Sequence, residues 1–334
     1  MQIEAYSAAA VFDNLKPDWN ALVDRSQVRT PFQTNEFQHT WWTHFGTGDL
    51  CILLARSDSG ELEGIASLFV DPKGVLRWVG GEEIADYLDV IAPPEQMEPV
   101  RQAVFTWLTR PDAPIWQRAQ LSNTPDWTET LEHWQALARE KGWMAEIKEL
   151  DVCPIVPLPS SFEEYLNQID GKQRREIRRK RRRAEGGENA VAWYVVSPEM
   201  DLEAETETFL QLMTASHPTK AEFLTSEMRA AFRDIFANMH AAGWLQLAFL
   251  TVGESPVAAY INFKFANRIW VYNSGLDPDK AVGISAGWVL LAYLIEDAIK
   301  NGHTRFDFLQ GGEDYKLRFG GKPVRVCRLS IERN

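Results

Sequence analysis

Short apolar runs separated by turn residues recur with the same order and spacing in two parts of the chain. The runs of the first part are 51–56, 64–70 and 75–79, with SDSGE and DPKG between them. The runs of the second part are 245–252, 257–265 and 268–272, with GESP and AN between them. Apolar runs bounded by Gly, Pro, Asp and Ser are typical of strands joined by tight turns. We therefore expect two antiparallel meanders of three strands each.

Helical segments flank both meanders, and one more strand follows each. The expected helices are 36–45 and 95–109 in the first part and 226–242 and 285–301 in the second, and the later strands are 115–121 and 304–309. Pro154, Pro157 and Pro159 interrupt any helix between the two parts. The pattern predicts an α+β fold of two similar domains, residues 1–155 and 156–334, each a mixed and mostly antiparallel sheet flanked by helices.

Composition limits the class of protein. The 334-residue chain is 45% hydrophobic and 25% charged, which is typical of a globular protein and not of a disordered one. It has no apolar run near the ~20 residues of a membrane helix and no signal-peptide pattern, so we expect a cytoplasmic protein that is not integral to a membrane. Cys51, Cys153 and Cys327 are far apart and the histidines lack metal-ligand spacing, so neither disulfides nor a metal site is expected.

The net charge of −12 is unevenly distributed along the chain. Residues 172–183 contain nine cationic side chains and one acid, Glu176, and this net +8 leaves −20 for all other residues. Arg and Lys favour helices and only Ile177 is apolar, so the segment predicts a helix without a wide apolar face. It is either a solvated helix paired with acids or a site for an anionic ligand: a phosphorylated substrate, an RNA acceptor stem or lipid headgroups. Because the positive charge does not cover a face, DNA binding is not expected.

Several short motifs of the chain resemble those of a known protein family. Residues 306–316, FDFLQGGEDYK, resemble the signature FDF-x-x-G-x-E-x-YK of a bacterial group of CelD-type acetyltransferases. Ser285, Ala286 and Gly287 stand where that group usually has Ser-Pro-Gly. Further matching motifs are PFQ at 31–33, WW at 41–42, DY at 86–87 with Asp89, and FEEY at 162–165. The chain thus resembles tandem GNAT acyltransferases of the CelD type, from cellulose and exopolysaccharide pathways, and is more distantly similar to Fem-type aminoacyltransferases of peptidoglycan synthesis.

The resemblance implies that acyl-CoA is the co-substrate and that the second domain binds it. In a GNAT fold the pyrophosphate meets a loop of small residues and the N-terminus of the next helix, where free N–H groups face the phosphates. The residues expected there are Tyr272, Val282, Gly283, Ile284, Ser285, Ala286 and Gly287. The loop of the first domain, 80–96, lacks closely spaced glycines, so that domain is expected to be degenerate. An ordinary capped core helix is the alternative interpretation of the pattern.

Transfer of an acyl group to an amine needs a base, donors for the oxyanion and a proton for the departing thiolate. Alternation along 304–309 directs Asp307 away from the phenylalanines of that strand. Glu313 is the expected base or ligand of the acceptor ammonium, with Asp307 as the alternative. Tyr315 is expected to give the thiolate its proton, and Lys316 to stabilise negative charge. A salt-bridged strand and turn would explain the same residues.

The first domain is expected to act as a scaffold that completes the acceptor cleft. The candidate substrate-binding residues are Asp86, Tyr87 and Asp89 in that domain and Arg175 and Arg179 on the basic helix. A solvated loop with turn-forming Asp is the alternative for the first three. The resemblance implies an acceptor amine on a small molecule or on a cell-envelope, polysaccharide or peptidoglycan precursor. Two other functions stay open: Fem-type transfer from aminoacyl-tRNA, with the basic helix holding RNA, and a non-catalytic binding protein on a degenerate GNAT fold.

Overall fold

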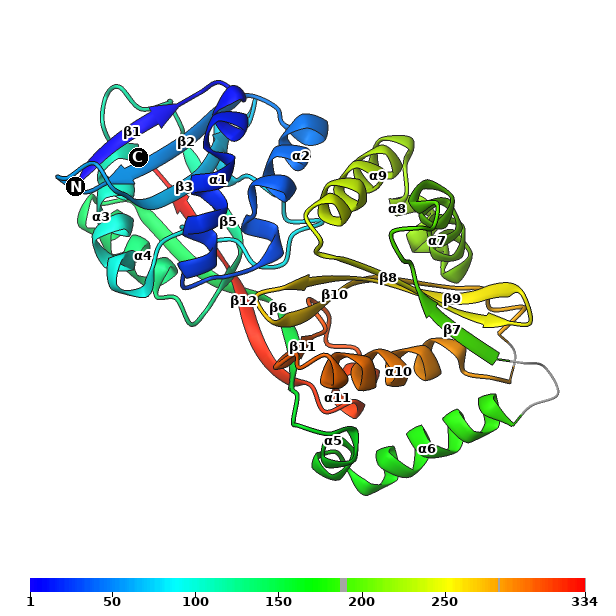
Figure 1. Cartoon of the computed structure of the whole chain (residues 1–334). Coiled ribbons are helices and arrows are strands. Elements are labelled where there is room, and N and C mark those ends of the chain that lie inside the picture. Colours follow the sequence, from blue (N-terminus) through cyan, green and yellow to red (C-terminus); the bar gives the residue numbers. More distant parts are fainter. Residues whose placement is uncertain (187–190, 282, 334) are drawn as a thin grey trace. The chain divides into compact units, whose positions relative to one another are not determined.

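The structure, a computed structural model, describes residues 1–186, 191–281 and 283–333 and contains two compact units (Figure 1). Unit 1 comprises Met1–Val152 and the segment from Val324 onward, and unit 2 comprises Cys153–Pro323. The sequence analysis placed the boundary after residue 155 and assigned the last segment to the second domain. The chain instead returns to unit 1 at Val324, because its final strand is hydrogen-bonded there.

Unit 1 is a mixed sheet covered by helices. Its strands follow the order β1 (Gln2–Tyr6), β2 (Asp49–Arg56), β3 (Leu62–Val70), β4 (Val75–Trp78), β5 (Arg118–Pro125) and β12 (Lys322–Glu332). Its helices are α1 (Ala10–Arg25), α2 (Asn35–Phe45), α3 (Met97–Leu108) and α4 (Thr130–Glu140), with 3₁₀ turns η1 (Pro31–Gln33) and η2 (Pro94–Gln96). These neighbouring strands pair antiparallel, except that β4 and β5 are parallel.

Unit 2 has a sheet of the same kind. Its strands follow the order β6 (Met144–Pro157), β11 (Arg305–Asp307), β10 (Arg268–Leu276), β9 (Ser255–Phe265), β8 (Leu245–Val252) and β7 (Val191–Val195), and β6 belongs to this unit only from Cys153. One face carries α7 (Leu202–Ser216), α8 (Pro218–Phe223) and α9 (Ser226–Ala241) (Figure 1). The other carries α10 (Ala286–Lys300) and, outside it, α6 (Gly171–Glu185) (Figure 1). Two further helices, both short, are α5 (Phe162–Gln168) and α11 (Asp314–Arg318).

The twofold pattern predicted from the sequence is confirmed. The meanders β2–β3–β4 and β8–β9–β10 both pair antiparallel. In each unit the third strand of the meander then pairs in parallel with the strand that follows the next helix, β4 with β5 and β10 with β11. The predicted α+β class of two tandem units is therefore correct. The sequence analysis did not predict the elements outside this order, which include β1, α1, α4, β7, α7 and α11.

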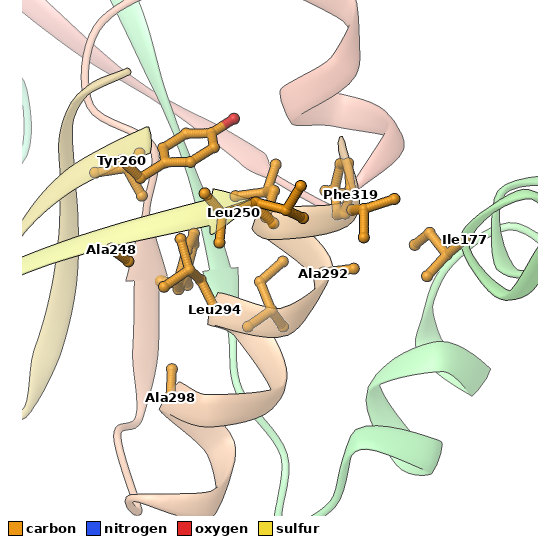
Figure 2. Close-up of a cluster of buried hydrophobic side chains, with 14 of the residues drawn as sticks. Ile177, Ala248, Leu250, Tyr260, Ala292, Leu294, Ala298 and Phe319 are labelled. Atoms are coloured by element: carbon orange, nitrogen blue, oxygen red, sulfur yellow. The ribbon is translucent and has the colours of Figure 1, made fainter. Parts of the chain in front are cut away.

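The core of unit 2 lies between the sheet and α10. Figure 2 shows Leu294 of α10 near Ala248 and Leu250 of β8, and all three side chains are buried. On the outer side of α10, Ile177 of α6 lies opposite Ala292, and both are completely buried (Figure 2). Because the sheet covers α10 on one side and α6 covers it on the other, the sequence of α10 is apolar nearly all round.

Each unit obtains its last strand from a distant part of the chain. β6 begins in unit 1, and its final residues pair antiparallel with β11 in unit 2. β12 returns to unit 1 and pairs antiparallel with β5, where Val326, Leu329 and Ile331 are buried. Unit 1 is therefore built from two segments of chain, and unit 2 is inserted between them.

The strand β12 should contribute strongly to the free energy of unfolding of unit 1. Leu329→Ala is expected to lower the free energy of unfolding by about 2–5 kcal/mol, because a buried side chain is lost and a cavity remains. Glu332→Ala, at an exposed position of the same strand, is the matched control and should change it by less than about 0.5 kcal/mol. Urea unfolding followed by tryptophan fluorescence measures both. Equal, small effects would show that β12 does not belong to the core of unit 1.

Candidate functional site

Most of the described residues between β10 and α10 are exposed. At the start of this segment, the side chain of Asp277 accepts hydrogen bonds from the N–H groups of Asp279 (3.0 Å) and Lys280 (3.1 Å). Further along, Gly283 and Ser285 are exposed and adopt left-handed conformations, with φ of +79° and +57°. A left-handed serine is uncommon, and here it turns the chain into the first turn of α10. The sequence expectation of an accessible loop at this place agrees with the exposure of these two residues.

The N-terminus of α10 is not capped by a side chain. Ser285 occupies the N-cap position, but its hydroxyl makes no capping hydrogen bond. The first N–H groups of the helix, including those of Ala286 and Gly287, have no intrahelical acceptor because no helical residues precede them. A Cβ atom at Gly287 would have no neighbouring atom within 4 Å. The positive end of the helix dipole therefore lies at an accessible surface.

The structure brings together most of the residues expected to bind the donor. Those in the loop and first turn of α10 are Gly283, Ile284, Ser285, Ala286 and Gly287, whereas Val282 lies outside the described residues. Tyr272 lies elsewhere: its ring packs 4.7 Å from that of Phe263 and 5.8 Å from that of Phe232 in α9. These rings belong to the face of the sheet opposite α10, so Tyr272 is part of the aromatic core beneath α9.

Two cations of α6 lie beside the N-terminus of α10. The ammonium of Lys180 is 4.0 Å from the centre of the Trp288 ring in the first turn of α10. A guanidinium nitrogen of Arg183 lies 3.5 Å from the position that a Cβ atom would take at Gly283. An anion at the uncapped N–H groups would therefore meet the helix dipole and two positive side chains.

A stacked arginine, and not an apolar face, holds α6 on α10. The predicted basic helix is confirmed, and of its apolar side chains only Ile177 and one alanine are buried. The guanidinium of Arg181 lies 5.2 Å from the ring centre of Phe162 and 4.6 Å from that of Tyr293. It also pairs with Glu296 at 2.8 Å. Because the guanidinium is both stacked and paired in a largely covered position, it anchors the helix better than an exposed ion pair would.

Glu313 and Lys316 form an ion pair at the beginning of α11. The Glu313 Oε2 atom lies 2.9 Å from Lys316 Nζ, and the two side chains are 56% and 5% exposed. Lys316 Nζ also donates to the carbonyl oxygens of Leu309 (3.3 Å) and Gln310 (2.5 Å). At Gly311, where φ is +117°, a Cβ atom would lie 2.8 Å from Lys316 Nζ, so this turn requires glycine. Lys316 therefore holds the turn and orients Glu313, whose carboxylate reaches solvent.

Two tyrosines and a second lysine complete the polar cluster around Glu313. Burial raises the pKa of Tyr260 well above its usual value, and Tyr315 and Glu313 raise it further. Burial also raises the pKa of Tyr315, again with a smaller effect of Glu313. Both phenols therefore stay protonated near neutral pH. On α8, Lys220 Nζ donates to the carbonyl oxygen of Ser274 (2.5 Å), and burial lowers the pKa of Lys220 to about 8.

Asp307 lies at the point where two parallel strands diverge. Its side chain is buried, and Oδ1 accepts a hydrogen bond from the N–H of Leu309 (2.9 Å). β10 and β11 pair only as far as Trp270 and Asp307, although β10 continues to Leu276. The strands thus separate beyond Asp307. Asp307 itself stabilises the turn after β11.

In unit 1, the loop after β4 is filled by residues of the unit itself. Asp89 is 3% exposed, and its carboxylate accepts hydrogen bonds from a main-chain N–H (2.6 Å) and from the Thr130 hydroxyl (3.0 Å). Tyr87 is buried, and its ring lies 5.6 Å from that of Trp127. Asp86 is partly exposed. The sequence analysis expected this trio at an acceptor cleft, but Tyr87 and Asp89 are interior residues because the loop folds inward.

Sequence reasoning missed Lys220 and Tyr260. Neither belongs to a motif, and Tyr260 lies in an apolar run that indicates only a strand. The signal that could have found Lys220 is the start of a short helix at His217 and Pro218. His217 Nδ1 accepts a hydrogen bond from the N–H of Thr219 (3.2 Å), which fixes that start and thereby the position of Lys220.

The described residues contain neither a membrane-spanning helix nor a cluster of metal ligands. No helix there has both the length and the apolar character needed to cross a membrane. Among the same residues, no three His, Cys, Asp or Glu side chains lie together in a way that could hold a metal ion. Cys51, Cys153 and Cys327 are buried free thiols.

Comparisons with known proteins agree with the fold of both units. Residues 171–317 match the family model described as the acetyltransferase (GNAT) domain. FemX superposes with a TM-score of 0.70 at 11% identity, covering 98% of this chain and 97% of that one. The chain has the fold of the GNAT and Fem-like superfamily. No curated protein matches the sequence, and the likeness to the CelD-type group stays a prediction.

Two further solved structures superpose on nearly the whole chain. One is the C-terminal domain of a protein described as a lysylphosphatidylglycerol synthetase from Agrobacterium fabrum, with a TM-score of 0.60 at 11% identity, covering 98% of this chain and 93% of that one. The other is a tandem GNAT protein from the clavulanic acid biosynthesis pathway, with a TM-score of 0.53 at 10% identity, covering 99% and 98%. At such identities the likeness concerns the fold alone.

Asp89 should make the stability of unit 1 depend on pH. Burial raises the pKa of its carboxyl group from 3.8 to about 6. Between these values the unfolded chain loses the proton before the folded one does, so the free energy of unfolding falls as pH rises, by up to about 3 kcal/mol from this group. Asp89→Asn removes the contribution, so the stability of the wild type relative to the variant should fall between pH 4 and pH 7 in urea unfolding. Parallel pH profiles would contradict the raised pKa.

Proposed function

We propose that this protein is an acyltransferase whose unit 2 transfers an acyl group from acyl-CoA to an amine. The observation that carries the proposal is the accessible, uncapped N-terminus of α10, with Lys180 and Arg183 beside it. The cluster around Glu313 belongs to the same unit. The match to the GNAT domain spans both features.

The residues at the N-terminus of α10 suit a diphosphate. The N–H groups of Ala286 and Gly287 and the helix dipole favour phosphate oxygens, and the missing Cβ of Gly287 lets a ligand approach the backbone. The guanidinium of Arg183 adds a charge-assisted donor. In unit 1 the corresponding helix, α3, follows the proline-containing turn η2, and the loop before that turn is filled. We therefore assign donor binding to unit 2 alone.

The chain's own residues would then position the acceptor and move its proton. Acyl-CoA supplies the activated thioester. The carboxylate of Glu313, accessible on one side and held by Lys316 on the other, binds the acceptor ammonium and accepts its proton directly or through a water molecule. The protonated phenols of Tyr315 and Tyr260 can give a hydrogen bond or a proton to the departing thiolate.

Two of the residues expected to take part in the chemistry have positioning roles in this proposal. Lys316 already donates to two carbonyl oxygens and pairs with Glu313, so it orients the base and does not stabilise charge on the acyl group. Asp307 is buried and bonded to a main-chain N–H, which leaves Glu313 as the accessible carboxylate. The geometry thus favours Glu313 over Asp307 as the base.

The acceptor we propose is an amine on a small molecule or on a precursor of the cell envelope or of a polysaccharide. The similarity to FemX and to the domain of a lysylphosphatidylglycerol synthetase supports an envelope acceptor. The FemX similarity also supports a second candidate function, transfer from aminoacyl-tRNA. In that case the cations of α6 would contact RNA, whereas a diphosphate would have no part in binding the donor.

Acetyl-CoA is expected to raise the melting temperature of the chain. A ligand at 100 times its Kd stabilises the folded state by ~2.7 kcal/mol. Gly287→Trp puts a large side chain at the open N-terminus and should abolish the shift while leaving the melting temperature of the free protein unchanged. Glu98→Trp, the exposed second residue of α3, is the matched control and should keep the shift.

The outcomes of this titration separate the three functions. A shift that Gly287→Trp abolishes and Glu98→Trp retains supports acyl-CoA binding at α10. Binding of RNA without a shift by coenzyme A would support the aminoacyl-tRNA donor instead. Absence of a shift with every acyl-CoA tried, together with absence of RNA binding, would support a non-catalytic protein.

Glu313→Gln is expected to lower kcat/KM by about 10²–10⁴-fold, because the base is lost while the ligand-binding loop is unchanged. Lys316 keeps its two carbonyl acceptors, so the turn should stay folded. Asp314→Asn, the neighbouring exposed acid, is the matched control and should keep nearly full activity. Release of free thiol from acetyl-CoA in the presence of amino sugars or diamino acids measures the rate. Similar rates for the two variants would exclude Glu313 as the base.

A further inference from the structure

The outward face of α6 carries a row of exposed cations. The row consists of Lys172, Arg175, Arg179 and Arg182, all of them exposed. It lies on the side of the helix opposite Ile177, which faces α10 (Figure 2). Arg179 pairs with Glu176, but no carboxylate among the described residues pairs with the other three. Like charges one helical turn apart repel, so an anion that covers the row would stabilise it.

A groove of about 870 Å³ runs beside this row, between α5, α6 and α10. Its lining is part apolar and part cationic: Phe162 and Leu166 come from α5, and Arg175, Arg178 and Arg182 from α6. The carboxylates of the groove are all paired, Glu163 with Arg178, and Glu185 and Glu296 with Arg181. Guanidinium groups beside an apolar floor suit a phosphate that is attached to an apolar group.

We propose that this face of α6 docks the protein on the surface of a bilayer that contains anionic phospholipids. α6 is the outermost layer on its side of unit 2, beyond α10, so a flat surface can touch the whole row (Figure 1). The remainder of the chain carries −20, but charges more than about 8 Å from the surface are screened at physiological ionic strength. The attraction is therefore local to the helix.

The composition of the row favours a lipid surface over a nucleic acid. The row contains no aromatic side chain to stack on a base and no amide to bond a base edge. Nucleic acid would thus be bound through its phosphates alone. A phospholipid also brings a glycerol ester that can contact the partly exposed ring of Phe162.

The strength of docking should follow the number of cations in the row. Each Lys or Arg near an anionic surface contributes about fivefold to the binding constant. The triple variant Lys172→Gln, Arg175→Gln, Arg182→Gln should therefore bind about 100-fold more weakly. It retains Arg183, which belongs to the proposed donor site, so its response to acetyl-CoA should equal that of the wild type. The proposed docking and the proposed donor binding can thus be tested independently of each other.

Co-sedimentation of the full chain with vesicles tests the proposal. The wild type should bind vesicles of phosphatidylcholine and phosphatidylglycerol and release them at high salt. It should not bind vesicles of phosphatidylcholine alone. The matched control is Lys73→Gln, Arg118→Gln, Lys148→Gln, which removes three exposed cations of unit 1 and gives the same net charge. The control should bind like the wild type.

Three results would overturn the proposal. The first is equal loss of binding in the two triple variants, which would reduce the effect to net charge. The second is full vesicle binding by the variant of α6. The third is tighter binding of an RNA duplex than of vesicles, with the same dependence on Lys172, Arg175 and Arg182, which would assign the row to RNA.

Discussion

The burial of α10 on two sides is the constraint on which unit 2 depends. The sheet covers one side of this helix, and α6, held by the stacked guanidinium of Arg181, covers the other. Because buried residues occur along α10 from Ala286 to Ile299, packing holds its N-terminus in position. The same packing brings Lys180 and Arg183 to that end. The basic helix α6 thus covers one side of α10 and also places positive charge beside the loop.

The two units differ in the loop that precedes the helix after the meander. In unit 2 the loop before the helix exposes Gly283 and Ser285. In unit 1 the equivalent loop turns inward, and Tyr87 and Asp89 occupy the interior. Burying a carboxylate is costly, and hydrogen bonds to Asp89 offset only part of that cost, since its pKa stays raised. Filling the loop stabilises unit 1 and removes the space that a ligand would need.

The sequence predicted the repeat because its signals are local. Apolar runs and turn residues located both meanders, and the extent of β8 was predicted residue for residue. The loop before α10 and the turn around Glu313 could be found because glycine marks positions that other residues cannot adopt, as at Gly311. Lys220 and Tyr260 could not be found, since only the pairing of distant strands and helices brings them to Glu313.

The sequence also could not predict the last strand of unit 1 or the inward fold of its loop. β12 has no local signal for its partner, because its register with β5 depends on the whole sheet. Tyr87 and Asp89 have the composition of a surface turn, and only the hydrogen bonds of Asp89 show that the loop is interior. The pattern of apolar and polar residues therefore does not predict which polar residues long-range contacts bury.

The interrupted chain of unit 1 bears on how the protein is made. On the ribosome, β5 emerges long before its neighbour β12, and all of unit 2 is synthesised between them. During that interval the edge of β5 is without this partner, and an unpaired strand edge is a hazard for aggregation. Unit 2 has its complete set of strands earlier and can fold first. A chain that ends prematurely after unit 2 would therefore contain a folded unit 2 and an incomplete unit 1, which lacks β12.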